Sequence, residues 1–239
     1  MNMMLLRESD FIAPERIRIS GRRTKHIREI LKTETGGSVK VGKINGLIGK
    51  AVIESDDNNQ IELTVNLHSD PPIPLPITLI LAMPRPIAFK RMLPAIVSFG
   101  IKELHLFSAR KVEKSYWSSS VFDEFDELVG LGLEQARDTI WPNITLHKRF
   151  RPFVEDEIPT IVAGKVALVA HPGSGLTCPA GLAEPSAICI GPEGGLTDFE
   201  LEILLRQGFQ AVGLGERILR TEVAVPAIIG RLIHATTKN

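Results

Sequence analysis

Six short apolar runs in the second part of the chain constrain the fold more than any other feature. Between residues 73 and 239, the runs PITLILAM, ELHLFSA, NITLHKRF, KVALVAHP, AICIG and AVGLG alternate with segments of helical character. Several of these runs are apolar throughout, which is typical of strands that helices cover on both faces. Strands and helices in alternation favour a parallel sheet. The sequence therefore predicts an α/β domain here.

A proline-rich segment, SDPPIPLP, separates this domain from an N-terminal part of different character. Four prolines in eight residues favour a stiff, extended connection. Before it, SVKVGKINGLIGKAVIE alternates apolar and polar residues around Asn45-Gly46, a strong hairpin signal, and QIELTVNL indicates a further strand. RRTKHIREIL is the one segment with a helical pattern. We therefore predict two domains, a small and mostly β domain over residues 1–72 and the α/β domain over residues 73–239.

Composition excludes several classes of protein. The chain has 239 residues, 44% of them hydrophobic, and no apolar run approaches the roughly 20 residues of a membrane helix. Its two cysteines, Cys178 and Cys189, cannot form a disulfide framework, and its six histidines lack metal-ligand spacing. A Gly-x-Ser-x-Gly hydrolase motif does not occur. We expect a cytoplasmic protein without a bound metal and without a membrane anchor.

Basic residues concentrate in one short stretch, although the net charge of the whole chain is zero. Residues 16–28 hold six Lys or Arg residues and no acid: Arg16, Arg18, Arg22, Arg23, Lys25 and Arg28. Such a block has two interpretations, a solvated face or a patch that contacts nucleic-acid phosphates. The residues themselves leave both open.

Three glycine-containing loops follow consecutive predicted strands in the last third of the chain. They read AHPGSG, IGPEGG and LGERILRTE, and loops at the carboxyl ends of neighbouring strands form one pocket. In the second loop, Thr197 and Glu200 have the spacing of a capping box, which predicts a helix from Asp198 to Gly208. The loops match neither the phosphate-binding P-loop nor the dinucleotide fingerprint. Spacing alone does not identify the ligand.

These loops carry a family resemblance. IGPEGGLTDFE, followed by LGERILRTEVA, resembles the RsmE family of SPOUT methyltransferases, which methylate N3 of a uridine in 16S ribosomal RNA. KHIREILKTETGGSV, SAR at Ser108–Arg110 and EQARDTIWPNI are similar to further segments of the family. The resemblance implies a PUA-like β-barrel for the first domain and a trefoil-knotted, parallel-sheet methyltransferase fold for the second. It also implies a homodimer that acts on the small ribosomal subunit.

The resemblance further implies a cofactor, S-adenosylmethionine, and the residues that hold it. The expected cofactor-binding residues come from all three loops: His171, Gly191, Pro192, Glu193, Gly194, Gly195, Leu214, Gly215, Ile218 and Leu219. For Ile218 and Leu219, packing in the core is the alternative. The six basic residues of the N-terminal stretch would then anchor the RNA backbone.

For catalysis, we expect Arg220 to stabilise the charge that develops on the uracil oxygens. Glu193 or Glu222 would orient the cofactor or Arg220, or would simply stand at a helix start, and His171 is either a base or structural. A last helix should have Thr221 at its N-cap, within TEVAVPAIIGRLIHATT, although Pro226 conflicts with a helix interior. Two rival functions stay open: a methyltransferase of this fold with another RNA or atom as its target, and a non-catalytic RNA-binding assembly factor.

Overall fold

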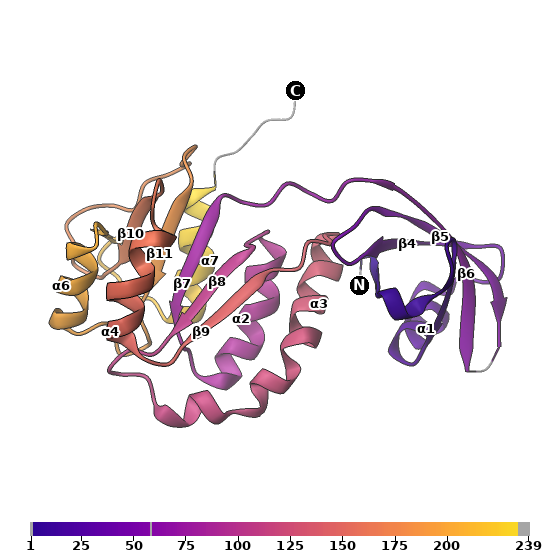
Figure 1. The fold of residues 1–239 in the computed structure, drawn as a ribbon, viewed down its shortest axis with the longest axis horizontal. Helices are drawn as coiled ribbons and strands as arrows, with labels where there is room; N and C mark the ends of the chain where they lie inside the picture. Colours follow the sequence, from indigo (N-terminus) through magenta and orange to yellow (C-terminus); the bar gives the residue numbers. More distant parts are fainter. Residues whose placement is uncertain (1, 58, 234–239) are drawn as a thin grey trace. The chain divides into compact units, whose positions relative to one another are not determined.

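The computed structural model describes residues 2–57 and 59–233, and the chain divides into two compact units (Figure 1). The first unit comprises Met1–Ile73 and Val129–Trp141, and the second comprises Pro74–Leu128 and Pro142–Asn239. The change of unit at residue 73 falls in the proline-rich segment, next to the predicted boundary at 72. The assignment of residues 129–141 to the first unit was not predicted. Residues 234–237 of the predicted last helix lie outside the described residues.

The first unit is built on one six-stranded sheet in the order β1-β4-β5-β6-β3-β2. Its strands are β1 (Met4–Leu6), β2 (Phe11–Ala13), β3 (Arg16–Ser20), β4 (Ser38–Lys43), β5 (Ile48–Asp56) and β6 (Gln60–Ser69). A short 3-10 turn, η1 (Glu8–Asp10), precedes β2, and α1 (Arg22–His26) continues into a π-helical turn, η2 (Ile27–Leu31). The predicted hairpin, the strand QIELTVNL and the helix are confirmed. The strands pack over a core of buried Ile, Leu and Val side chains that includes Leu6, Ile17 and Leu63.

The hairpin loop explains why residues 129–141 belong to the first unit. Asn45 donates its backbone N–H to the carbonyl of Thr139 at 2.8 Å, and its side-chain oxygen accepts from Trp141 N–H at 2.8 Å. Thr139 in turn donates its hydroxyl to the carbonyl of Gly46 at 2.5 Å. The Asn-Gly turn therefore binds a segment more than 90 residues away in the sequence, which a local pattern cannot indicate.

The second unit contains a six-stranded parallel sheet in the order β12-β10-β11-β7-β8-β9. All six predicted strands are present: β7 (Ile77–Ala82), β8 (Glu103–Phe107), β9 (Asn143–His147), β10 (Val166–Ala170), β11 (Ser186–Ile190) and β12 (Gln210–Val212). The helices are α2 (Pro86–Ser98), α4 (Phe150–Pro152), α5 (Ile158–Ile161), α6 (Asp198–Arg206) and α7 (Thr221–Leu232). A further helix, α3 (Phe125–Ala136), begins in this unit, and its residues 129–136 belong to the first unit. Short turns are η3 (Lys114–Ser118), η4 (Ser120–Glu124) and η5 (Phe153–Glu157). The α/β prediction is confirmed, and α2 lies beside α7 (Figure 1).

Strands β7 and β11 are buried at every position, as expected for the centre of a sheet covered on both faces. In the segment 121–140, whose apolar residues recur at a helical spacing, Val129 and Leu133 are fully buried, whereas Phe122 and Phe125 are half-buried. The described residues contain no helix long and apolar enough to cross a membrane.

A polar network crosses β7, β8 and β9 on the second unit's sheet. The Glu103 carboxylate accepts from Lys165 at 2.9 Å and from the Thr78 hydroxyl at 2.5 Å, and its other oxygen lies 3.2 Å from His105. Burial raises the pKa of Glu103, but the hydrogen bonds from Thr78, Lys165 and His105 outweigh burial and bring it to about 2. For His105, burial lowers the pKa and outweighs its attraction to Glu103.

Candidate active site

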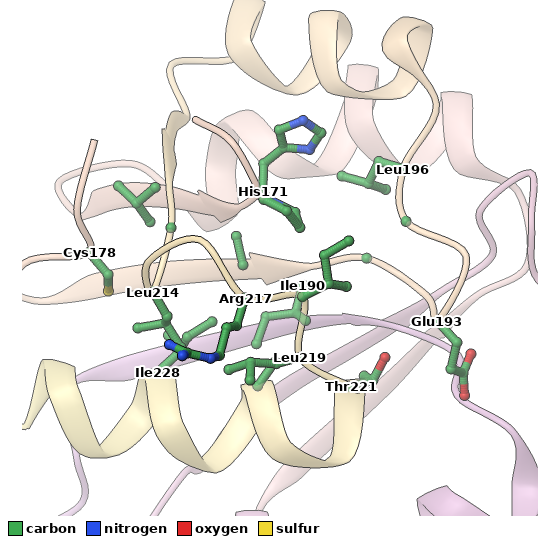
Figure 2. A pocket seen from close by; sticks show the side chains of 18 of the residues that line it. His171, Cys178, Ile190, Glu193, Leu196, Leu214, Arg217, Leu219, Thr221 and Ile228 are labelled. Carbon is green, nitrogen blue, oxygen red and sulfur yellow. The ribbon is translucent and has the colours of Figure 1, made fainter. Parts of the chain in front are cut away.

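The carboxyl ends of β10, β11 and β12 meet at one edge of the parallel sheet. Since β10 lies between β12 and β11, the loops that follow the three strands come together. They enclose, with α7, a cavity of about 380 Å³ (Figure 2). This volume falls in the range of small-molecule sites. The three glycine loops, which sequence analysis assigned to one pocket, are therefore neighbours in the structure.

All ten predicted cofactor-binding residues line this cavity: His171, Gly191, Pro192, Glu193, Gly194, Gly195, Leu214, Gly215, Ile218 and Leu219. The sequence reasoning missed eleven lining residues: Ala170, Pro172, Cys178, Ile190, Leu196, Val212, Gly213, Arg217, Thr221, Ala224 and Ile228. Three of them, Ala170, Ile190 and Val212, are the last residues of β10, β11 and β12. The position at a strand end was a usable signal for these three.

The loop after β11 is shaped by a turn and a helix cap. Gly195 has φ +71°, a conformation that glycine adopts without strain, and its N–H donates to the carbonyl of Pro192 at 2.8 Å. Thr197 is the N-cap of α6, and the reciprocal capping box with Glu200 is present. The predicted capping box is confirmed, and the helix begins at Asp198 as expected.

Glu200 also links α6 to the loop after β8. Its side chain is almost fully buried, and one carboxylate oxygen accepts from Arg110 N–H at 2.6 Å. The other oxygen accepts from both the backbone N–H and the hydroxyl of Thr197, each at 2.8 Å. Beside it, Lys111 donates from Nζ to the carbonyl of Gly194 at 2.7 Å. The segment with the Ser-Ala-Arg sequence thus helps to fix the glycine-rich loop.

Glu193 bonds to backbone at a helix start. Its Oε1 accepts from the N–H of Arg85, the N-cap residue of α2, at 3.0 Å. Figure 2 shows its carboxylate at the rim, away from Leu214, Leu219 and Ile228. Of the roles considered for Glu193, a place at a helix start is the one for which the structure provides a contact.

The loop after β12 leaves its backbone available to a ligand. Gly215 has φ +103°, which requires glycine. In the part of the chain that the structure describes, the N–H and C=O groups of Leu214, Gly215 and Leu219 have no hydrogen-bond partner. Ile218 is 83% exposed. Core packing, the alternative for Ile218, is therefore wrong.

Arg220 lies next to the cavity without lining it. It is the N-cap residue of α7, and its side chain is 85% exposed. Glu222 is its ion-pair partner at 3.9 Å. The prediction of Thr221 as N-cap is wrong by one residue, since Thr221 is the first residue of the helix. Pro226 lies inside α7 despite the conflict that the sequence indicated, since the helix runs from Thr221 to Leu232.

Cys178 and Cys189 are both free and buried. Burial raises the pKa of both thiols above the ordinary value, so both are neutral near pH 7. No group of three or more His, Cys, Asp or Glu residues that could hold a metal ion occurs in residues 2–57 and 59–233.

The six basic residues predicted to bind RNA lie in the first unit, and each has an acidic partner. Arg16 and Arg18 both pair with Glu62, Arg22 with Glu134, Arg23 with Asp10, Lys25 with Glu29 and Arg28 with Asp56. Arg23 forms two hydrogen bonds of 2.6 Å to the buried Asp10, which makes it a link within the unit. The other side chains are more exposed, with Lys25 the most exposed.

The fold and the site define a class of protein, the RNA methyltransferases. A family model described as an RNA methyltransferase domain matches residues 71–233. A ribosomal RNA small subunit methyltransferase E of Treponema pallidum is 32% identical over 211 residues, which cover 84% of this chain and 79% of the relative. Another from Synechocystis is 25% identical over 238 residues, 94% of this chain and 76% of the relative. The chain therefore belongs to the family of ribosomal RNA small subunit methyltransferase E, the RsmE family.

Solved structures agree with this fold over almost the whole chain. A ribosomal RNA small subunit methyltransferase E from Neisseria gonorrhoeae, bound to S-adenosyl methionine, has a TM-score of 0.74 at 20% identity and covers 96% of this chain and 95% of its own. A methyltransferase of Legionella pneumophila, in complex with the same cofactor, has a TM-score of 0.71 at 19% identity, with coverage of 95% and 94%.

Proposed function

We propose that the protein is an S-adenosylmethionine-dependent methyltransferase that methylates N3 of a uridine in 16S ribosomal RNA of the small subunit. The observation that carries this proposal is the cavity of about 380 Å³ at the ends of β10, β11 and β12, in a chain of the RsmE family. Apolar side chains line this cavity, together with backbone N–H and C=O groups that have no hydrogen-bond partner among the described residues. A cytoplasmic location, where ribosomal subunits are made, is part of the proposal.

The residues present fit the cofactor. Leu214, Leu219 and Ile228 provide apolar surface for the adenine ring, and the free backbone groups of Leu214, Gly215 and Leu219 can bond to polar ring edges. Side chains larger than hydrogen at Gly195 and Gly215 would be strained, because both residues have positive φ. When bound, S-adenosylmethionine supplies an electrophilic methyl group. The protein must then position the acceptor in line with it.

Arg220 is the proposed catalytic residue. Uridine N3 carries a proton between two carbonyl groups, and negative charge develops on the carbonyl oxygens when that proton leaves. The guanidinium of Arg220 is exposed beside the cavity, and its ion pair with Glu222 is long at 3.9 Å. It can therefore turn toward a base brought to the cavity and stabilise this charge. The acceptor base must leave its stack to reach the cavity, as in other base-modifying enzymes.

Glu193 is proposed as a positioning residue for the glycine-rich loop. Its hydrogen bond to Arg85 N–H connects the loop after β11 with the start of α2. His171 lines the cavity and is proposed to contact the cofactor.

We propose that the first unit is PUA-like. Its more exposed basic residues would contact the RNA: Arg16, Arg18, Arg22 and Lys25. Arg23 and Arg28 mainly stabilise the unit through Asp10 and Asp56.

We further propose a trefoil knot in the second unit. We also propose a homodimer, since the apolar side chains of Ile87, Ile218 and Val223 are exposed on that unit.

The test is methyl transfer from labelled S-adenosylmethionine to small ribosomal subunits that lack their own modification, followed by mass spectrometry of the nucleosides. We expect 3-methyluridine as the product. A different methylated nucleoside would refute the N3 assignment and favour a methyltransferase with another target. Cofactor binding without transfer to any RNA would favour an assembly factor.

A further inference from the structure

A second cavity, of about 320 Å³, lies in the first unit. Its lining includes three buried apolar residues, Met4, Ile27 and Val39. Leu31, which is 43% exposed, stands at its rim. The cations Lys40 and Arg137 also line it, with the hydroxyl residues Thr33 and Ser38. The cavity therefore combines apolar surface with positive charge.

The positive charge at this cavity is not balanced by the protein. Among the residues that the structure describes, Lys40 and Arg137 have no ion-pair or hydrogen-bond partner for their side chains. This contrasts with the basic stretch at residues 16–28, where every cation has a carboxylate beside it. The sequence block of highest positive charge is thus largely neutralised, whereas this cavity is not.

Lys40 also lies opposite a like charge on the sheet, at a residue that does not line the cavity. Lys40 on β4 is paired in register with Lys50 on β5, and both side chains are exposed. Like charges directly opposite each other on antiparallel strands are destabilising. Lys50 also has no ion pair within the described part of the chain. An anion bound at this face would relieve the repulsion.

Arg137 occupies a backbone conformation that arginine does not favour. It follows the last residue of α3 and has φ +56°, the left-handed conformation that usually ends a helix at glycine. A non-glycine residue there carries a backbone cost. The sequence nevertheless places a long cationic side chain at this position, on the wall of a cavity.

We propose that this cavity holds one unstacked nucleotide of the RNA substrate. Its phosphate lies between Lys40 and Arg137, and its base lies against the exposed apolar side chain of Leu31. The site would anchor the RNA at the first unit while the target uridine reaches the cofactor cavity. This inference rests on the proposed function, because it takes RNA as the substrate. We infer a nucleotide as the ligand because its phosphate can pair with the two cations and its base can contact the apolar side chain.

The test compares Arg137→Gly with Lys32→Gly. Lys32 has φ +50° and is exposed, so the control removes the same charge from the same backbone conformation at a residue that does not line the cavity. Binding of protein-free small-subunit ribosomal RNA is measured by filter retention over a range of salt concentrations. Loss of one phosphate contact to a single strand reduces the slope of log K against log salt by about 0.7. We expect this reduction for Arg137→Gly and an unchanged slope for Lys32→Gly.

Two further measurements separate binding from folding and from the proposed function. Arg137→Gly should unfold at the same or a higher temperature than the wild type, since glycine suits φ +56°. Leu31→Ala should weaken binding several-fold with the slope unchanged, because it removes apolar contact only. Equal slopes for Arg137→Gly and Lys32→Gly would overturn this site alone. A wild-type protein that binds cofactor but no ribosomal RNA would refute the proposed RNA substrate and this site with it.

Discussion

Replacing Glu200 with alanine should weaken both the second unit and its cofactor cavity. The carboxylate accepts three hydrogen bonds, from Thr197 N–H, the Thr197 hydroxyl and Arg110 N–H. As N3 of a capping box, Glu200 also completes the start of α6. The reciprocal bond of the capping box, which Glu200 N–H donates to Thr197 Oγ1, does not involve the carboxylate and survives the substitution.

The magnitude follows from two losses. Loss of a capping interaction costs about 1 kcal/mol. Arg110 N–H loses its acceptor in a partly buried setting, which costs about 1–3 kcal/mol. The free energy of unfolding should therefore fall by roughly 2–4 kcal/mol, and the midpoint of thermal unfolding by about 4–16 °C for a unit of this size.

The assay is thermal unfolding followed by circular dichroism, together with calorimetric titration of S-adenosylmethionine. Glu202→Ala is the matched control, because Glu202 lies on the same helix, is exposed and pairs only with Arg206 within the described residues. We expect the control to change stability by less than about 0.5 kcal/mol. Cofactor affinity should fall in Glu200→Ala alone, since the glycine-rich loop ends at this cap. Indistinguishable behaviour of the two variants would refute the reasoning.

Three other predictions concern charge and burial. Arg220→Ala should bind S-adenosylmethionine within about twofold of the wild type but lose methyl transfer, because Arg220 does not line the cavity; near-normal turnover would rule out its catalytic role. The free energy of unfolding should fall as pH drops through 6.5, because His105 binds a proton in the unfolded state at a higher pH than it does when buried in the native state. It should fall again between pH 4.5 and about 2, because the pKa of Glu103 is lower in the native state than in the unfolded state. Urea titrations across pH measure both steps, and an unchanged first step in His105→Gln would contradict the assignment. Ellman's reagent should label Cys178 and Cys189 only after unfolding, because both are buried and have raised pKa values; rapid labelling of the native protein would contradict this.

Local patterns predicted the elements that carry the site. Several of the six strands after residue 73 are continuous apolar runs, and the Thr197–Glu200 cap is a four-residue signal, so neither depends on distant contacts. By contrast, Arg16–Ser20 was interpreted by its charge alone. Its alternation of Arg and Ile is a strand pattern, with Ile17 and Ile19 buried in β3.

The partners of the basic residues could not be predicted in the same way. Glu134 lies 112 residues from Arg22, and Asp10 lies 13 residues from Arg23 across a turn and two strands. Ion pairs of this kind depend on tertiary packing, so no regular spacing of residues in the sequence indicates them. The role of Glu193 was open for the same reason, because its partner, Arg85 N–H, is 108 residues away.

The most direct test of the account is calorimetric titration of S-adenosylmethionine into the wild-type chain, Ala224→Phe and Ala163→Phe. Ala224 lines the cavity, so a benzyl group there should occupy the space of the ligand, whereas Ala163 is exposed elsewhere on the same unit. The account predicts saturable binding at one site per chain for the wild type and Ala163→Phe, and its loss in Ala224→Phe. Full binding by Ala224→Phe, or no binding by the wild type, would contradict the assignment of this cavity.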